Sequence, residues 1–497
     1  MRATYDAAET TDENYKHWSR ADNLSPNVAN NVGVRRTLRN RARYERANNP
    51  YCKGLVSTIA ADTIGTGPRL SLTIPGVSST KIQQVEGTFA NWCLATNFAD
   101  KLRVKCEAKI VDGDSVSLLF TNPRVEHPVK LDVRTYEADQ CTTPFLDSFD
   151  PLAVDGLRLD KYGNAIEYHL LKYRPSGMGG MIPWDYDKID AKAILHWFRP
   201  DRPGQMRGVS EIASALPLFA YLRRYTLASV AAAEIAAMLA GIMYTDQPAD
   251  GNGQGEGPKL YDAIELVRGM LLSLPEGWKA EQFGAKQPAP AYKEFKGEIL
   301  CEIARSVNAT FNIIAGNSSG YNYSSGRLDH VIYFRSIRVE RHRMRWHILD
   351  RLLRAWLEEA MFVEGLLPDG LPPFCTWTWD WYWDGFESID PLKDATSNVV
   401  LLQSNQTTLK EIYAEYGQDW EPHLRQRARE LALCAELGIS PVQAVPTATT
   451  SSPKRKPIDD APADEDEANG EDDDASMKQA WAIGEAMLDS EVEYAYS

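Results

Sequence analysis

The pattern of hydrophobic and polar residues is clearest between residues 312 and 360. Apolar residues recur there every three to four positions, the period of an α-helix, at Leu328, Val331, Phe334, Met344, Ile348, Leu352 and Leu353. Basic residues follow the same spacing at Arg335, Arg338, His342 and Arg345. They predict a cationic stripe beside the apolar face. Residues 317–326, just upstream, are small, polar and uncharged. The pattern therefore predicts a soft loop leading into one long, basic, amphipathic helix, which suits the handling of a polymer.

Other helical periods lie on both sides of this segment. Residues 35–48 predict a basic helix that stops at Asn49-Pro50, because the residue before a proline disfavours helix. Further helices are expected over residues 51–63, 81–95, 293–307 and 409–437.

The segment Leu227–Tyr244 is apolar, rich in alanine, and carries a single charge, Glu234. Its length is at the short end of the membrane-spanning range, and a glutamate costs about 2.5–3.5 kcal/mol at the bilayer centre. We therefore expect a helix packed against protein rather than a membrane span. It follows a helical run from Gly208 that Arg223 and Arg224 interrupt.

Short strands and turns are expected from about residue 96 to Trp197, so the fold class is α+β. The predicted strands cover residues 69–74, 115–121, 130–136, 157–159, 165–171, 269–274 and 278–283, with a hairpin turn at 160–164. His196 lies in a strand-like ILHWF run and is expected to be a core residue. Four tryptophans alternate at Trp377, Trp379, Trp381 and Trp383. A strand would place all four on one face, and such a stripe is more often core than a ligand platform.

The formal net charge of −15 is unevenly distributed. Residues 453–497 hold 14 acidic and 4 basic side chains, a net −10, which leaves −5 for residues 1–452. A body so close to neutral does not bind nucleic acid tightly and non-specifically, because such binding needs many phosphate neutralisations. Beyond residue 443 the composition predicts disorder, with a short helix at 477–488.

Seven scattered cysteines without a CxxC pair are expected to be free, buried thiols in a reducing compartment. Enzyme signals are weak as well. The alternating glycines of residues 251–257 precede a proline instead of joining a strand to a helix, so no nucleotide loop is expected. The acid pairs Asp112 with Asp114 and Asp380 with Asp384 could hold Mg²⁺. They leave a metal-dependent DNA-processing nuclease as an alternative function, but no catalytic residue, metal or cofactor is assigned.

Five segments in collinear order carry a resemblance to one family. They are NNPYCKGLVSTIAADTIGTGPRLSL (48–72), VDGLRLDKYG (154–163), HWFRPDRPGQMRGVSEIASAL (196–216), NYSSGRLDH (322–330) and IDPLKDA (389–395). Over residues 15–440 the chain resembles portal proteins of tailed bacteriophages, of the lambda type. The acidic tail falls outside the resemblance.

The resemblance implies a portal-type fold with an α/β wing, long stem helices, a small clip and a helical crown, assembled as a ring that usually has twelve subunits. The implied parts are an N-terminal arm (1–25), wing (26–215), stem helix (216–245), clip (246–290), second stem helix (291–310), tunnel loop (311–326), long kinked helix with a Trp-rich wing strand (327–395), crown (396–442) and disordered acidic tail (443–497).

The resemblance also implies a function without enzymatic activity. A ring at one capsid vertex would conduct double-stranded DNA during packaging and ejection, and would dock the terminase large subunit and later the head–tail adaptor. The expected partners are other copies of the chain, DNA of any sequence, these two proteins, and the major capsid and scaffold proteins, with no membrane. The expected location is the virion, after assembly in the host cytoplasm. Another virion structural protein, an adaptor or minor capsid protein, is the alternative.

The implied channel residues are the uncharged tips of the tunnel loop: Asn317, Ser318, Ser319, Asn322, Ser324 and Ser325. Neutral tips can touch the DNA backbone partly through water and release it quickly, and near-neutral to acidic channel walls would keep the duplex centred. Four basic residues of the long helix are expected to contact either phosphates or neighbouring subunits: Arg327, Arg335, Arg338 and Arg345.

Overall fold

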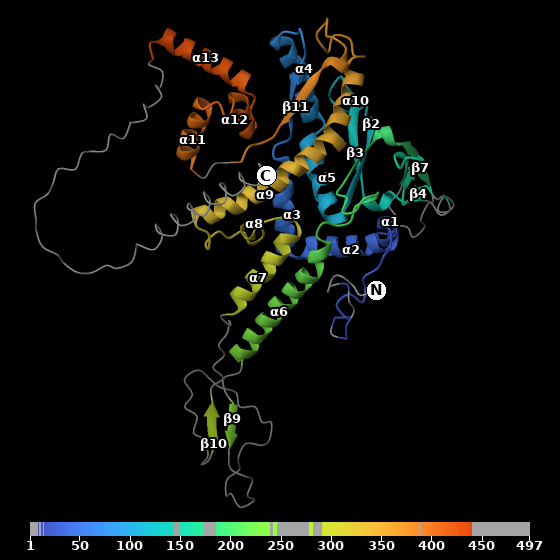
Figure 1. Cartoon of the computed structure of the whole chain (residues 1–497), viewed down its shortest axis with the longest axis vertical. Helices are drawn as coiled ribbons and strands as arrows, with labels where there is room; N and C mark the ends of the chain where they lie inside the picture. Colours follow the sequence, from blue (N-terminus) through green and yellow to red (C-terminus); the bar gives the residue numbers. More distant parts are fainter. Residues whose placement is uncertain are drawn as a thin grey trace, which may run out of the picture. The chain divides into compact units, whose positions relative to one another are not determined.

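The computed structural model describes residues 8, 11–12, 14–143, 150, 152–172, 185–238, 242–245, 278–281, 291–386 and 390–439 (Figure 1). The chain divides into two compact units, residues 1–428 and 429–497. All elements below belong to the first unit, except the end of helix α13. The described part is mixed helix and sheet, as the sequence predicts.

Helices α2 (Val32–Asn48) and α3 (Pro50–Ile64) meet at the break expected at Asn49-Pro50. The Asn49 side chain accepts a hydrogen bond from the Tyr51 amide, so one residue ends α2 and caps α3. The short helix α1 (Pro26–Ala29) precedes α2. Helix α4 (Ser79–Ala95) buries Phe89 and Trp92, as its apolar period predicts.

One helix was missed: α5 (Phe98–Asp112) occupies a region predicted to hold only strands and turns. Its buried face includes Leu102 and Ile110 but also Lys105 and Lys109, which are 1% and 2% exposed. Because two lysines take core positions, the apolar period that marks a helix is broken.

Two antiparallel sheets follow. The first has the strand order β3-β2-β8, with β2 at Asp114–Thr121, β3 at Leu131–Tyr136 and β8 at Ile194–Phe198. The second has the order β4-β5-β6-β7, made of Ala153–Val154, Leu157–Leu159, Ala165–Leu171 and Tyr186–Asp190. The Asp160 side chain accepts hydrogen bonds from the amides of Tyr162 and Asn164, which confirms the predicted hairpin turn.

Strand β1 (Arg69–Thr73) pairs with β11 (Thr378–Tyr382), more than 300 residues later. The tryptophan stripe lies here: Trp377 and Trp381 are buried in the main core, and Trp379 and Trp383 pack against it half-buried. The indole Nε1 atoms of Trp379 and Trp381 both donate to Asp350 Oδ1, at 2.8 and 2.9 Å. The prediction that the stripe belongs to the core is confirmed.

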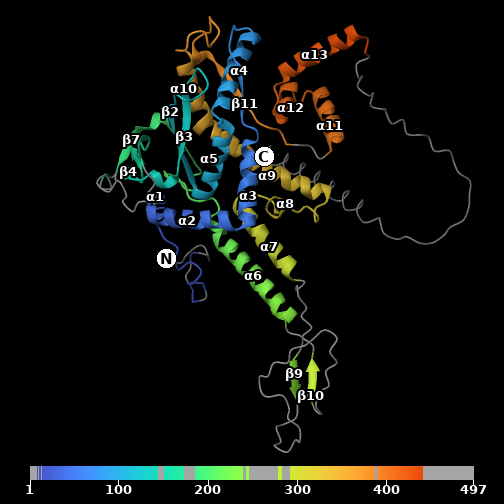
Figure 2. The same ribbon diagram turned by 180° about the vertical axis from the view of Figure 1, so that it is seen from behind.

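Helices α6 (Leu216–Met238) and α7 (Ala291–Ser306) lie side by side in both views (Figures 1 and 2). The rings of Tyr225 and Tyr292 stack between them at 5.5 Å. The prediction that Arg223 and Arg224 interrupt this helical run was wrong. Helix α6 is continuous through both residues, and the side chain of Arg223 pairs with Glu45 at 2.6 Å.

The predicted helix to residue 245 was also wrong at its end, since α6 stops at Met238. Residues Ile242–Thr245 form strand β9, which pairs with β10 (Trp278–Glu281). The β-branched Ile242 and Thr245 and the aromatic Tyr244 favour a strand once a pairing partner is present. None of the helices in the described residues is long and apolar enough to span a membrane.

The described part ends with α11 (Pro391–Gln403), α12 (Leu409–Glu415) and α13 (Trp420–Leu437). The prediction of a single helix over 409–437 was wrong. The chain turns at Gly417 between α12 and α13, and the φ of +70° at this position favours glycine. The expectation of buried thiols fails for Cys301 and Cys375, which are exposed. The predicted strand 269–274, most of the clip, and the acidic tail with its helix at 477–488 lie outside the described residues.

Candidate functional site

The polar loop observed in the structure is shorter than the predicted loop of residues 311–326. Helix α8 (Phe311–Ala315) ends at Gly316, whose φ is +60°, and α9 begins at Tyr323. The loop between them is therefore residues 316–322. Ser324 and Ser325 lie in the first turn of α9, so the prediction that placed them in the loop was wrong. The NYSS segment contained the signal, because an Asn before a helical run is a preferred N-cap.

The loop is held by its own polar side chains. Asn322 Oδ1 accepts from the Ser325 amide at 2.8 Å, and Ser325 Oγ accepts from the Asn322 amide at 3.2 Å, a reciprocal capping box. Asn317 Oδ1 accepts from the Ser319 amide at 2.9 Å. Asn317, Ser318 and Ser319 are exposed, and residues 311–326 contain no acid, lysine or arginine. The loop tip is thus polar, neutral and open to solvent.

The long helix runs through α9 (Tyr323–Met344), a π-helical turn (Arg345–Leu349) and α10 (Asp350–Ala360). Its second half follows the predicted apolar face, with Met344, Ile348, Leu352 and Leu353 all buried. The extra residue per turn of a π-helix rotates the faces before and after it relative to one another.

The first half differs from the prediction. Leu328 and Val331, predicted on the apolar face, are 63% and 49% exposed, while Tyr333 and Ile337 are buried instead. The Tyr333 hydroxyl donates to Asp62 Oδ2 at 2.6 Å, and burial together with Asp62 raises the pKa of Tyr333. The solvent-facing side of α9 and of the π-helical turn that follows it is a mixed ridge of apolar and basic residues, which we call the α9 ridge. It consists of Leu328, Val331, Ile332, Arg335, Arg338, Val339, His342 and Trp346.

The four candidate arginines separate into two kinds. Arg327 pairs with Asp394 at 3.6 Å. Arg345 lies 3.5 Å from both Asp350 and Asp380 and donates to the Trp379 carbonyl at 2.8 Å.

Arg335 and Arg338 are exposed and form no ion pair or hydrogen bond within the described residues. They remain available to another molecule. Sequence reasoning missed Arg341, which is buried and donates to the backbone carbonyls of Asp62 and Thr63 at 2.8 and 3.1 Å.

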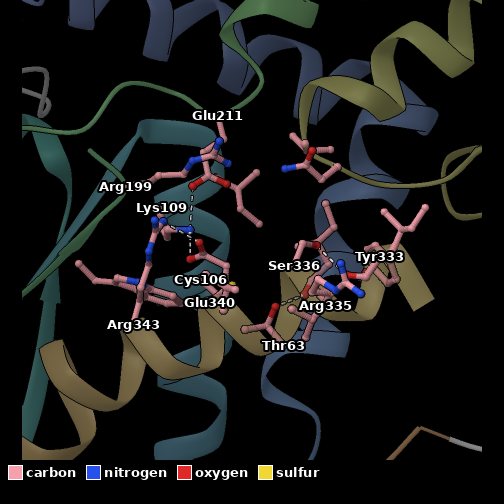
Figure 3. A pocket seen from close by; sticks show the side chains of 18 of the residues that line it. Thr63, Cys106, Lys109, Arg199, Glu211, Tyr333, Arg335, Ser336, Glu340 and Arg343 are labelled. Atoms are coloured by element: carbon pink, nitrogen blue, oxygen red, sulfur yellow. Dashed lines mark hydrogen bonds and ion pairs between the residues drawn. The ribbon is translucent and has the colours of Figure 1, made fainter. Parts of the chain in front are cut away.

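A pocket of about 440 Å³ lies beside α9, against α3, α5, β8 and the end of α7 (Figure 3). Lys109 lies inside it and contacts Glu211 and Glu340 at 2.7 and 2.6 Å. Burial opposes the charge on Lys109, but the two carboxylates outweigh burial and raise its pKa. Arg335 lines this pocket, so one residue of the predicted basic stripe borders it.

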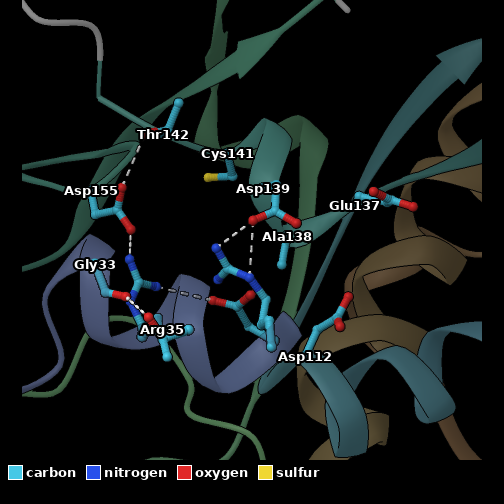
Figure 4. A network of polar contacts seen from close by, with 12 residues as sticks. Gly33, Arg35, Asp112, Glu137, Ala138, Asp139, Cys141, Thr142 and Asp155 are labelled. Carbon is cyan, nitrogen blue, oxygen red and sulfur yellow. Dashed lines mark hydrogen bonds and ion pairs between the residues drawn. The ribbon is translucent and has the colours of Figure 1, made fainter. Parts of the chain in front are cut away.

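The acid pair Asp112 and Asp114 does not form an open metal site. Arg43 donates to both oxygens of Asp112, at 2.7 and 2.6 Å, and Arg207 Nε donates to Asp114 at 2.5 Å. Figure 4 shows Asp112 within a network in which arginines face the carboxylates. A carboxylate held by a guanidinium offers fewer free oxygens to Mg²⁺.

The carboxylates of the second acid pair, Asp380 and Asp384, are also paired with basic side chains. Asp380 pairs with Arg345 and Lys410, and Asp384 pairs with Arg69 at 2.9 Å. No group of three or more His, Cys, Asp or Glu residues that could hold a metal ion occurs among the described positions. His196 is a buried residue of β8, as predicted, and burial lowers its pKa to about 4.

Exposed apolar surface such as the α9 ridge is typical of a surface that contacts another molecule. A family model described as "Phage portal protein, lambda family" matches residues 13–341. The chain belongs to the lambda family of phage portal proteins. It is 22% identical over 432 residues to a probable portal protein of Halomonas phage phiHAP-1, and the match covers 81% of each chain.

Solved structures with some similarity come from gene transfer agent particles. The neck of an empty particle, computed with C6 symmetry, matches with a TM-score of 0.42 and 15% identity, over 76% of this chain and 93% of that chain. The neck of a native particle, computed with C12 symmetry, matches with a TM-score of 0.41 and 15% identity, over 76% of this chain and 94% of that chain.

Proposed function

We propose that this portal protein forms a closed ring of twelve identical subunits at one capsid vertex, through which double-stranded DNA passes during packaging and ejection. The observation that carries the proposal is the α9 ridge next to the neutral loop. A single subunit leaves large apolar side chains in water along the same helix whose N-terminal end carries the loop.

The ridge supports a ring because its composition is that of an interface. Leu328, Val331, Ile332, Val339 and Trp346 are each 49–63% exposed. Contiguous apolar surface of this kind on a soluble chain marks a protein contact. In a closed ring each subunit presents unlike surfaces to its two neighbours, so the ridge would cover a different surface of the next copy.

The loop supports a DNA channel because of what it lacks. A channel must pass every sequence in both directions, so tight phosphate binding would slow transport. The exposed amides and hydroxyls of residues 317–319 can contact phosphates through water without holding them. The free arginines, Arg335 and Arg338, lie three to four turns along α9 from the loop. They would contact a neighbouring subunit or the DNA backbone.

The remaining partners follow from the portal role. The terminase large subunit would dock during packaging and the head–tail adaptor afterwards, both on the clip. The major capsid and scaffold proteins would contact the wing, and residues 396–442 would form the crown. The protein would then reside in the virion after assembly in the host cytoplasm.

Ring formation is tested by mass photometry and negative-stain electron microscopy of the purified chain. We expect particles of about twelve subunit masses with a central hole wide enough for a duplex. A chain that stays monomeric or dimeric at high concentration would contradict the proposal.

The channel role of the loop is tested by adding charge without changing shape. Asn317→Asp with Asn322→Asp keeps the acceptor oxygens that Ser319 and Ser325 use, and Asp caps a helix as well as Asn does. We expect intact rings that protect several-fold less DNA from nuclease in a packaging assay, because a ring of acidic tips repels phosphates.

The control adds the same charge elsewhere, with Asn405→Asp and Gln406→Glu in an exposed turn. Packaging equal to that of the control would show that the loop does not face DNA. Loss of rings in the loop variant alone would make the loop an assembly element.

A further inference from the structure

Helix α7 carries a row of acidic side chains on its solvent-facing side. Glu294, Glu298 and Glu302 are four residues apart, so they lie one turn above another on one face of the helix. All three are exposed, and their carboxylates form no ion pair or hydrogen bond within the described residues. None of the other helices in the described part has three acidic residues at this spacing. Because like charges one turn apart repel one another, a basic surface from outside the chain would stabilise the row.

The acidic surface extends from α7 to the first half of α9. Burial, Glu298 and Asp329 of α9 together raise the pKa of the exposed Cys301 thiol. Both carboxylates therefore lie near this thiol, one on each helix. We call Glu294, Glu298, Glu302 and Asp329 the acidic patch.

The basic residues of α7 lie outside the acidic patch. Lys296 points away from it, with its ammonium over the rings of Tyr51 and Tyr292 at 5.1 and 5.5 Å. Lys293 and Arg305 flank the row at the two ends of the helix. The surface between these two bases is therefore of one sign, and its row of glutamates is about 12 Å long.

The α9 ridge carries charge of the opposite sign. Arg335 and Arg338 are exposed and form no ion pair or hydrogen bond within the described residues, and His342 follows one turn later. Asp329 and Arg338 are separated by about two and a half helical turns, so their side chains point to opposite sides of α9. A single subunit thus presents an acidic patch on one side of this helix and unpaired arginines on the other.

We propose that the acidic patch of one subunit packs against Arg335 and Arg338 of the α9 ridge in a second copy of this chain. The inference rests on the proposed ring and names the surface that would cover its ridge. Patch and ridge are different surfaces, so the contact is heterologous and can be repeated around a closed ring. Phe295, which is 50% exposed beside the glutamates, would meet the apolar residues of the ridge.

Charge reversal tests the contact in full-length rings, with mass photometry as the readout. Glu298→Arg and Arg338→Glu each place like charges against one another. Each should raise the subunit concentration at which half of the rings dissociate by at least about tenfold. The two changes combined in one chain restore opposite charges at every contact and should recover most of the wild-type affinity. Recovery requires that the two surfaces face one another, because independent effects add.

Glu364→Arg and Arg354→Glu are the matched controls. Both residues are exposed and unpaired in the described part of the chain, and both lie outside the patch and the ridge. Neither control should change the dissociation of the ring. The contact is overturned if the single reversals behave like the controls, or if the double reversal dissociates at least as readily as either single one. If the wild-type chain makes no rings, the proposed function itself fails, whereas wild-type rings that ignore the reversals contradict only this contact.

Disulfide trapping gives a second measurement that keeps all of the charges. Cys301 lies within the acidic patch, and Val339→Cys adds a thiol to the ridge in a Cys375→Ser background, which removes the other exposed native thiol. Oxidised rings should give a ladder of cross-linked oligomers on a non-reducing gel, whereas a disulfide within one chain leaves only monomer. Val104→Cys, at a similarly exposed site on α5, is the control. A ladder with Val339→Cys alone supports the contact, and a ladder with both variants or with neither overturns it.

Discussion

Two helices of this protein carry basic residues at helical spacing, and the structure uses them in opposite ways. Arg35, Arg39 and Arg43 of α2 face the sheets, where Arg39 and Arg43 both pair with Asp139, at 2.6 and 2.8 Å. Arg35 contacts Asp155 and is 1% exposed. On α9, by contrast, Arg335 and Arg338 face solvent.

The difference comes from residues far away in the sequence. The acids that neutralise α2 come from α5, the segment after β3 and the β4–β5 turn, about 70–120 residues further along the chain. A basic helix therefore stabilises the fold where the fold brings carboxylates to it, as in the α2 ion pairs, which we call the buried clamp. Where the fold brings no carboxylates, the basic helix is left as a surface for contact with another molecule. Changing each helix should have different consequences, either for the stability of the chain or for the stability of the ring.

The largest effect is expected from breaking the buried clamp with Asp114→Ala. Asp114 is fully buried, 3.7 Å from Arg35 of α2 and in contact with Arg207. Burial opposes its charge, but Arg207 and His196 hold its pKa well below its usual range. Removing one partner of a buried ion pair costs about 3–5 kcal/mol. Urea denaturation followed by circular dichroism measures the loss.

The matched control is Asp380→Ala, which removes an exposed acid that also contacts two basic residues. We expect it to cost less than about 1 kcal/mol. If Asp114→Ala and Asp380→Ala lower the free energy of unfolding by similar amounts, burial does not determine how much an ion pair contributes to the stability of this chain.

A somewhat smaller effect is expected from pH, through His196 in the same cluster. Its pKa is lowered to about 4, mainly by burial, against about 6.5 in an unfolded chain. Below pH 6.5 the unfolded chain takes up a proton that the folded chain does not, so stability falls as pH drops from about 6.5 to about 4. The contribution of His196 amounts to about 3 kcal/mol in total.

His196→Gln tests this contribution, since glutamine does not titrate. Denaturation midpoints at pH 7, 5.5 and 4.5 should decline less steeply for the variant than for the wild type. A parallel decline in the two proteins would mean that other groups cause the acid sensitivity. Residues of the α9 ridge provide the contrast, because Arg335→Ala should leave the pH profile unchanged.

The ridge is expected to affect assembly and not the fold. Val331→Asp places a charge on a surface that the single chain leaves 49% exposed, so the melting temperature of the monomer should change little. The subunit concentration for half-dissociation of the ring should rise at least about tenfold, because an unpaired charge would be buried in the interface. Val104→Asp, on an equally exposed site of α5, is the control in the same mass-photometry titration. Rings that tolerate both changes equally would remove the ridge from the interface.

The same comparison explains what the sequence could predict. Local patterns identified the break at Asn49-Pro50, strands β5 and β6 with their turn, and the tryptophan stripe. The prediction failed for α5, where buried lysines imitate a surface pattern.

It also failed on the first half of α9, where Leu328 has the period of a core residue but lies in water. Periodicity tells which residues share a helix face, but not whether the covering surface comes from the same chain. The bound state of Arg345 depends on Asp380 and Trp379 of β11, a strand that pairs with the distant β1, and no local pattern contains that pairing.

The smallest effect should separate two arginines that the sequence treats alike. Arg345→Ala removes contacts with Asp350, Asp380 and the Trp379 carbonyl, and it should cost the single chain about 1 kcal/mol because these groups are only partly buried. Arg335→Ala removes no contact within the described chain and should cost less than about 0.5 kcal/mol. Thermal denaturation of dilute, monomeric protein compares the two variants. If Arg335→Ala destabilises the monomer as much as Arg345→Ala does, Arg335 is bound within its own chain and is not available to a neighbouring subunit.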